Sequence, residues 1–137
     1  MGCYKIPEDV KNYIEAENDC IQKGGHLTSV HSKEEDEFLR RLIGPPDSPN
    51  HAPIIIIGGK VITEQDQLYR FYWTDGSPFD FFDNWSPGQP QTYGAQDCIG
   101  MMPGFDSSEG TWFIDTCDSA HKYICKKSVE GNCSLLF

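Results

Sequence analysis

The sequence predicts an α+β domain in which two helices come first and short antiparallel strands follow. Two observations support this prediction. Apolar residues recur every three or four positions in the first third of the chain, whereas beyond Pro53 they form short runs separated by Gly, Pro, Asp and Ser. The six cysteines are even in number and none lies in a Cys-x-x-Cys pair, so they favour structural disulfides over a zinc site.

Two amphipathic helices are expected before residue 45. The first spans Val10 to Ile21 and ends before the stop signal Gly24-Gly25. Its apolar residues are expected on one stripe that faces the core: Val10, Tyr13, Ile14, Ala16, Cys20 and Ile21. The second helix begins at Ser32, where Glu35 three positions later forms a capping box, and ends at Gly44. Its apolar residues are Phe38, Leu39, Leu42 and Ile43, and its opposite face carries Glu34, Glu37, Arg40 and Arg41.

Five β-type runs follow, at residues 54–57, 68–73, 98–102, 111–114 and 122–126. Between the Asp75-Gly76 turn and Cys98 lies a long stretch rich in Pro, Gly, Asp and Asn. A loop of this length in a small domain is typically functional. Its aromatic residues predict an ordered loop with a small core of its own: Phe79, Phe81, Phe82 and Trp85.

Length and charge restrict the function. With 137 residues the chain is expected to form a single domain, residues 1–137. Its formal charge of −10 disfavours nucleic acid and anionic membranes as partners, and it has no apolar run long enough to insert into a membrane. Disulfides indicate an oxidising compartment, so we expect a secreted protein whose leader has been removed. The sequons at Asn84 and Asn132 agree with this route, although their glycosylation stays open.

Short motifs occur in a characteristic order along the whole chain. The motifs are Cys3-Tyr4, Glu15-Ala16-Glu17 with Cys20, Gly24 to Ser32, Ile56-Ile57-Gly58-Gly59, Trp73-Thr74-Asp75-Gly76, Asn84-Trp85, Gln89-Pro90-Gln91, Asp97-Cys98, Trp112 and Tyr123-Ile124-Cys125. In this order they resemble the C-type lectin-like domain over nearly the whole chain. Ile56 and Gly59 depart from the Trp-Ile-Gly-Leu usual in that family.

This resemblance implies a disulfide pattern. It pairs Cys20 with Cys125, which ties the first helix to the last strand, and Cys98 with Cys117, which closes the loop region. Cys3 and Cys133 remain, and we expect a third bond between them because both would lie near the neighbouring chain ends.

The resemblance also implies a calcium and sugar site, which this chain has altered. The family's Glu-Pro-Asn or Gln-Pro-Asp is here Gln89-Pro90-Gln91, with a cis proline implied, and the Glu before Asp-Cys is Gln96. The Asn-Asp pair that follows a Trp is replaced by Phe113 and Ile114. Calcium takes about six to eight oxygens and prefers carboxylates, so we expect no metal and no cofactor.

One alternative rebuilds the ion site. A slip by one residue would move Asp115 into the ligand position, with Asp97 nearby, but it would also turn every side chain of that strand to the opposite face. The candidate metal ligands on this alternative are Gln89, Gln91, Gln96, Asp97 and Asp115.

The sequence therefore predicts an extracellular recognition module that binds a protein or glycan without calcium. The expected ligand-binding residues are Gln89, Pro90, Gln91, Tyr93, Gln96 and Phe113. A calcium-dependent lectin and a structural or ice-surface-binding protein are the alternatives. No nucleophile, base or phosphate-loop motif indicates an enzyme, and ligand identity and oligomeric state stay open.

Overall fold

The computed structural model describes residues 2–44, 54–65, 68–81, 84–92, 94, 96–102, 111–128 and 133. Its elements confirm the α+β class, although a short strand precedes the first helix. The helices are α1 (Tyr13–Gln22) and α2 (Lys33–Ile43). The strands are β1 (Gly2–Lys5), β2 (His26–Leu27), β3 (Ile55–Thr63), β4 (Tyr69–Trp73), β5 (Gln96–Met101), β6 (Trp112–Asp115), β7 (Lys122–Tyr123) and β8 (Cys125–Ser128).

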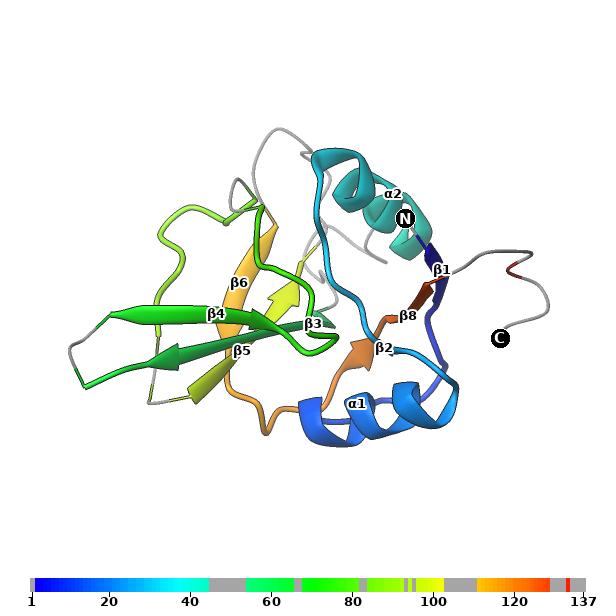
Figure 1. Cartoon of the computed structure of the whole chain (residues 1–137), viewed down its shortest axis with the longest axis horizontal. Helices are drawn as coiled ribbons and strands as arrows, with labels where there is room; N and C mark the ends of the chain where they lie inside the picture. Colours follow the sequence, from blue (N-terminus) through cyan, green and yellow to red (C-terminus); the bar gives the residue numbers. More distant parts are fainter. Residues whose placement is uncertain are drawn as a thin grey trace.

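The strands form two sheets that differ in their role (Figure 1). A three-stranded sheet in the order β1-β8-β2 joins the two ends of the fold, and α1 and α2 lie on either side of it. The larger sheet runs β4-β3-β5-β6, with β7 parallel to β3. The run expected at 122–126 is therefore two strands, because Tyr123 pairs with the large sheet and Cys125 with the small one.

The helix α1 begins at Tyr13 rather than Val10. Asn12 caps it, and Glu15 bonds back to the Asn12 backbone, so a capping box stands where the sequence prediction had none. Its buried residues are Tyr13, Ala16 and Cys20. Ile14 is 64% exposed and Ile21 50% exposed, and Val10 before the helix is also exposed. The single apolar stripe was wrong because one residue advances the helix by about 100°, which turns Ile14 away from the face of Tyr13.

The helix α2 begins where the sequence predicts, but only half of its capping box forms. Ser32 accepts from the Glu35 backbone N–H at 3.1 Å. The Glu35 carboxylate accepts instead from the His31 backbone N–H at 2.8 Å and from Tyr4, and it pairs with Lys126 at 2.6 Å. It is buried, and it joins α2 to β1 and β8.

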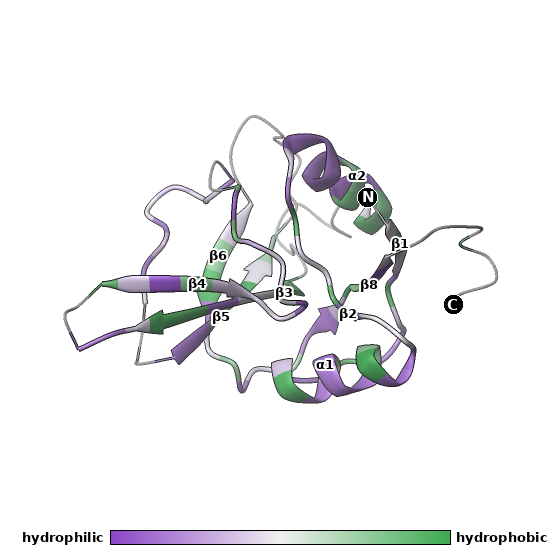
Figure 2. Ribbon diagram, viewed as in Figure 1, coloured by the Kyte–Doolittle hydropathy of each residue, from purple (hydrophilic) through white to green (hydrophobic). Residues whose placement is uncertain are grey.

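The expected division of α2 into an apolar and a charged face needs a second correction. Arg40 lies with its side chain 14% exposed and pairs with the buried Asp36 at 2.9 Å. The buried residues of α2 include the acids Glu35 and Asp36 beside Leu39. Figure 2 accordingly shows hydrophilic and hydrophobic residues alternating along both helices.

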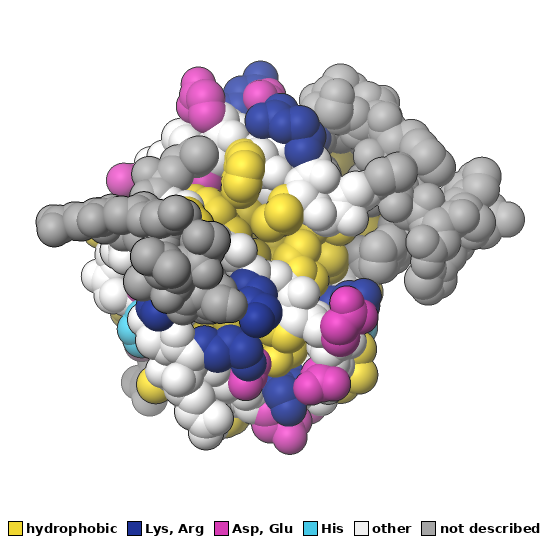
Figure 3. Space-filling model, turned by 90° about the vertical axis from the view of Figure 1, so that its right-hand side faces the viewer, with side chains coloured by type: hydrophobic (Ala, Val, Ile, Leu, Met, Phe, Trp, Pro, Cys, Tyr) yellow, Lys and Arg dark blue, Asp and Glu magenta, His cyan; other side chains and the backbone are white. Residues whose placement is uncertain are grey.

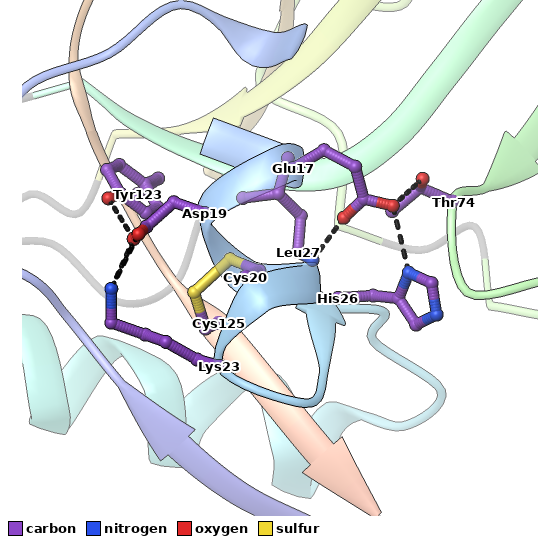
Figure 4. Close-up of a disulfide and its surroundings, with 9 residues drawn as sticks. All are labelled: Glu17, Asp19, Cys20, Lys23, His26, Leu27, Thr74, Tyr123 and Cys125. Carbon is purple, nitrogen blue, oxygen red and sulfur yellow. Dashed lines mark hydrogen bonds and ion pairs between the residues drawn. A yellow bond between two sulfur atoms is a disulfide. The ribbon is translucent and has the colours of Figure 1, made fainter. Parts of the chain in front are cut away.

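All three disulfides are confirmed: Cys3–Cys133, Cys20–Cys125 and Cys98–Cys117. The second joins α1 to β8 next to the contacts of Asp19 with Lys23 and Tyr123 (Figure 4). Apolar side chains also gather on the face that bears β1, β8 and α2, with lysine and arginine around them (Figure 3). Among the described residues no helix is long and apolar enough to cross a membrane.

Candidate ligand site

The long loop after β4 is built on an aromatic cluster around the fully buried Trp112. Phe79 stacks on Trp73 with ring centroids 4.4 Å apart. Phe81 and Trp85 each meet Trp112 edge-on at 5.7 Å. The loop aromatics are therefore packed, as predicted, but they are partly buried and pack against the main core of the domain rather than forming a core of their own. Phe82, expected in the same cluster, lies outside the described residues.

A polar contact fixes the first part of the loop to the link between the helices. His31 Nδ1 lies 2.8 Å from Asp80 Oδ1. The hydrogen bond from His31 lowers the pKa of the Asp80 carboxyl below its usual value. The loop is thus attached at Asp80, before it turns toward β6.

The next anchor is a buried polar network at Asn84, which is 7% exposed. Its amide nitrogen donates to Asp36 Oδ1 at 2.5 Å and to Thr111 Oγ1 at 3.3 Å. Its oxygen accepts from Arg40 at 3.0 Å, and Asp36 also accepts from the Trp112 indole at 3.1 Å. Both amide hydrogens of Asn84 are therefore bonded inside the protein, so this sequon is not available for a glycan in the folded state. Asn132 lies outside the described residues.

Residues 84–89 lie along the outer edge of β6 and hydrogen-bond to the backbone groups of that strand. Trp112 N–H donates to Asn84 O at 2.9 Å, and Ser86 N–H donates to Trp112 O at 2.8 Å. Two residues further along β6, the Ile114 N–H donates to the side-chain oxygen of Gln89 at 3.1 Å. The same oxygen accepts from the Gln91 N–H at 3.1 Å. Gln89 thus continues, with its side chain, the ladder that the loop backbone begins.

The remaining loop residues of the predicted site lie at or near the surface. The Gln89–Pro90 bond is cis, as the resemblance implies. Gln91 and Gln96 are exposed and Pro90 is partly exposed. Tyr93 lies outside the described residues. Gln91 and Pro90 therefore form a polar and apolar pair that a ligand can reach.

Phe113 and Asp115 lie on the other face of the large sheet. Trp112 and Ile114 point into the core, at 0% and 2% exposure, and the register of β6 on β5 shows no slip. Asp115 is paired with Cys98, so its side chain shares the face of Cys98, whereas the buried Asp97 points to the opposite face. Asp97 accepts from the Gly94 N–H at 3.2 Å, and Asp115 lies 3.4 Å from His121. The two carboxylates therefore cannot share one ion.

These donors do not fit a calcium ion. At the family's ligand positions stand the neutral amides of Gln89, Gln91 and Gln96, followed by Phe113 and Ile114, which have no side-chain oxygen. The Gln89 oxygen already accepts two backbone N–H groups. Calcium binding depends on charged oxygens that replace its hydration shell, and neutral amides provide them poorly. Among the described residues no group of three His, Cys, Asp or Glu side chains is arranged to hold a metal.

Sequence reasoning missed the Asp36 network and the role of Gln89. Asp36 and Arg40 are four positions apart, which marks an ion pair on a helix, but nothing in the sequence shows that the pair is buried. The position of Leu39 could have indicated the burial of Asp36. The two residues are three positions apart and lie on the same side of the helix, so a helix that buries Leu39 turns Asp36 inward as well.

Comparison with known proteins agrees with this architecture. A family model described as the lectin C-type domain matches residues 9–127. The C-type lectin lectoxin-Lio1 of Erythrolamprus poecilogyrus is 31% identical over 135 residues, which cover 94% of this chain and 76% of the relative. The crystal structure of CEL-IV superposes with a TM-score of 0.76 at 30% identity, covering 96% of this chain and 90% of that one. A calcium-independent type II antifreeze protein gives a TM-score of 0.69 at 29% identity, covering 92% and 85%.

Proposed function

Because the chain belongs to the C-type lectin domain family, we propose that it is a secreted, non-enzymatic recognition module that binds an extracellular protein or glycan without calcium. The loop 84–92 presents the ligand surface, with Gln91 and Pro90 as direct contacts. Gln89 holds this surface in place. Gln96 on β5 and Phe113 on β6 are further contacts of the proposed surface.

One observation supports the calcium-free mechanism most strongly. The Gln89 oxygen, which stands at a calcium-ligand position of the family, accepts from the backbone N–H groups of Ile114 and Gln91 at 3.1 Å each. A bound ion would have to replace both hydrogen bonds while gaining no charged oxygen from Gln91 or Gln96. In this chain the Gln89 side chain itself thus attaches the loop to β6.

Calcium titration tests this mechanism. After treatment with chelator, the melting temperature of the chain is expected to stay constant as calcium rises to millimolar concentration. A ligand that binds the folded state at a hundred times its Kd would stabilise it by about 2.7 kcal/mol, which a thermal scan resolves easily. A clear upward shift that chelator reverses would overturn the proposal.

Binding to arrays of glycans and of extracellular proteins, with and without chelator, tests the ligand surface. The variant Gln91→Ala is expected to weaken binding while leaving stability unchanged, because its side chain is exposed. Gln65→Ala, an exposed glutamine in the turn after β3, is the matched control. If the two variants bind equally to every ligand found, the loop is not the ligand surface.

An ice-surface function is the second candidate. It is favoured by the similarity to the calcium-independent type II antifreeze protein, over 92% of this chain. Thermal hysteresis of dilute protein tests it, and ordinary freezing without hysteresis would exclude it.

A further inference from the structure

The outward face of α1 carries large apolar side chains. Ile14 is 64% and Ile21 is 50% exposed, and Val10, which comes shortly before the helix, is 60% exposed. Seven residues of helix rise about 10 Å and make nearly two full turns, so Ile14 and Ile21 lie on one line along the helix axis. Grouped apolar side chains at a surface typically mark an interaction site, whereas single ones do not.

The inward face of α1 fixes the orientation of this line. Cys20 is bonded to Cys125 on β8, and the Tyr13 hydroxyl donates to Gly58 O at 2.9 Å (Figure 4 shows the disulfide). The helix cannot turn to bury either isoleucine without breaking these bonds. Both side chains therefore stay at the surface of the folded chain.

The apolar line is one residue wide. Glu17 lies on one side of it and the exposed Asn18 on the other, as the helical period of 3.6 residues requires. A flat apolar surface would leave these polar groups buried. A second helix fits better, because its own apolar residues recur every three or four positions and contact a narrow line along its length.

Exposed acidic residues surround the N-terminal half of the line, namely Glu8, Asp9, Glu15 and Asp118. Asp118 is close because the Tyr13 N–H donates to Cys117 O at 3.2 Å. The cations at this end are Lys11 and Lys122, the latter next to the residue that bridges to Lys11. The local charge is therefore negative, as is the charge of the whole chain at −10.

This charge selects among the partners that would cover the line. A second copy of the chain would bring the same acidic residues to the contact, and an anionic membrane would be repelled. A helix with lysine or arginine beside its apolar residues would instead pair them with these carboxylates, as the charges flanking the apolar seam do in coiled coils.

We propose that the outward face of α1 binds a basic amphipathic helix of a partner protein, with Ile14 and Ile21 as the apolar anchors and with Glu15 and the acidic residues near Val10 as the charged rim. This surface is separate from the ligand loop. In Figure 1, α1 lies at the bottom of the molecule and residues 84–92 lie at the upper left. The two contacts therefore do not exclude each other.

Fluorescence anisotropy with synthetic helices tests the surface. The probe is a labelled peptide of leucine and lysine, in which leucine recurs every three or four positions, and it is expected to bind the chain. Two control peptides are expected not to bind: one of the same composition in scrambled order, which has no apolar face, and one of the same pattern with glutamate in place of lysine. Equal binding of the scrambled peptide, or no binding of the probe, would overturn the proposal.

Substitutions on α1 test which residues make the contact. Ile14→Ser and Ile21→Ser are each expected to weaken binding of the leucine–lysine peptide about tenfold, because each removes an apolar anchor. Leu42→Ser is the matched control, since Leu42 is 43% exposed on α2, and it is expected to bind as the unmodified chain does. All three variants should melt close to the unmodified chain, because the side chains lie at the surface. Unchanged binding by both isoleucine variants would refute the assignment.

Glu15→Gln separates the charge from the apolar contact. Glutamine retains the capping-box bond to the Asn12 N–H, so the helix is kept while one carboxylate is lost. The affinity for the leucine–lysine peptide is expected to fall about twofold at low salt and less at high salt, because salt screens exposed charge pairs. Sedimentation equilibrium of the chain alone should show no association through this face. A dimer that Ile14→Ser dissociates would assign the face to a second copy and contradict the proposal.

Discussion

At Gln89 a single side-chain oxygen decides how the loop meets the sheet. It accepts from Ile114 N–H and from Gln91 N–H, and the first of these groups would otherwise be unpaired at a strand edge. A methionine at this position has nearly the same length and no strong acceptor. We expect Gln89→Met to lower the free energy of unfolding by about 1 to 3 kcal/mol, because it leaves one or both N–H groups without a partner. Urea unfolding measures the difference.

Two further variants separate the hydrogen bonds of the Gln89 oxygen from the effect of side-chain size. Gln89→Glu keeps the oxygen and is expected to retain most of the stability, since a carboxylate also accepts from backbone N–H groups. Gln91→Met, on an exposed side chain of the same loop, is expected to change stability by less than about 0.5 kcal/mol. Equal losses at positions 89 and 91 would show that the Gln89 oxygen does not anchor the loop.

The sequence predicts which residue types stand at the site, but not the bonds that they make. The lack of carboxylates at Gln89, Gln91 and Gln96 is a matter of residue type, so it could be predicted once the motif was aligned. The partner of the Gln89 oxygen could not, because Ile114 N–H belongs to a strand 25 positions away. Nor could the face of the sheet on which the half-buried Phe113 lies, because it depends on the pairing of β6 with β5.

Among the elements, the helices show where local patterns are sufficient. Ser32 was identified as an N-cap because its bond to the Glu35 N–H is local. The Glu35 carboxylate was expected to complete the capping box. It bonds instead to Tyr4 and Lys126, which are 31 and 91 positions away in the sequence. Local reasoning therefore finds helix ends, whereas tertiary contacts decide which polar side chains are buried.

The contact between α1 and β7 gives a prediction for acid stability. Asp19 bonds to Lys23 at 2.6 Å and accepts from the Tyr123 hydroxyl at 2.6 Å (Figure 4). The hydrogen bonds from Lys23 and from Tyr123 lower the pKa of Asp19 below its usual value. A lowered folded-state pKa contributes stability above the unfolded value of about 3.9, and this contribution is lost as the pH falls through the folded value. We therefore expect Asp19→Asn to lose stability at pH 7 and to show a shallower decline below about pH 4.

The measurement is the free energy of urea unfolding as a function of pH, for the chain and two variants. Lys23→Met removes the first cause of the shift but keeps the Tyr123 bond, so its decline with acid should lie between those of the chain and of Asp19→Asn. Parallel curves for all three proteins would show that Asp19 is not a source of the acid dependence.

For the whole molecule, the resemblance predicted the topology better than the patterning did. The resemblance assigned Cys20–Cys125 and Cys98–Cys117 correctly. The third bond, Cys3–Cys133, was expected between the two remaining cysteines near the chain ends, and β1 does lie next to β8. Periodicity alone found no strand at His26–Leu27 and joined β7 to β8, since such short strands have too few residues for a pattern.

Two of these disulfides are expected to depend on each other. Cys3 and Cys133 are 130 residues apart, yet the Cys20–Cys125 bond shortens the loop between them to roughly 25 residues in the unfolded chain. In the chain-entropy description, Cys3–Cys133 then contributes about 3.5 kcal/mol beside Cys20–Cys125 and about 5 kcal/mol without it. A cycle of Cys3→Ser/Cys133→Ser and Cys20→Ala/Cys125→Ala, followed by urea unfolding of all four oxidised proteins, should give a coupling near 1.5 kcal/mol. Strict additivity would mean that native-state contacts, rather than the unfolded chain, determine what the terminal disulfide contributes.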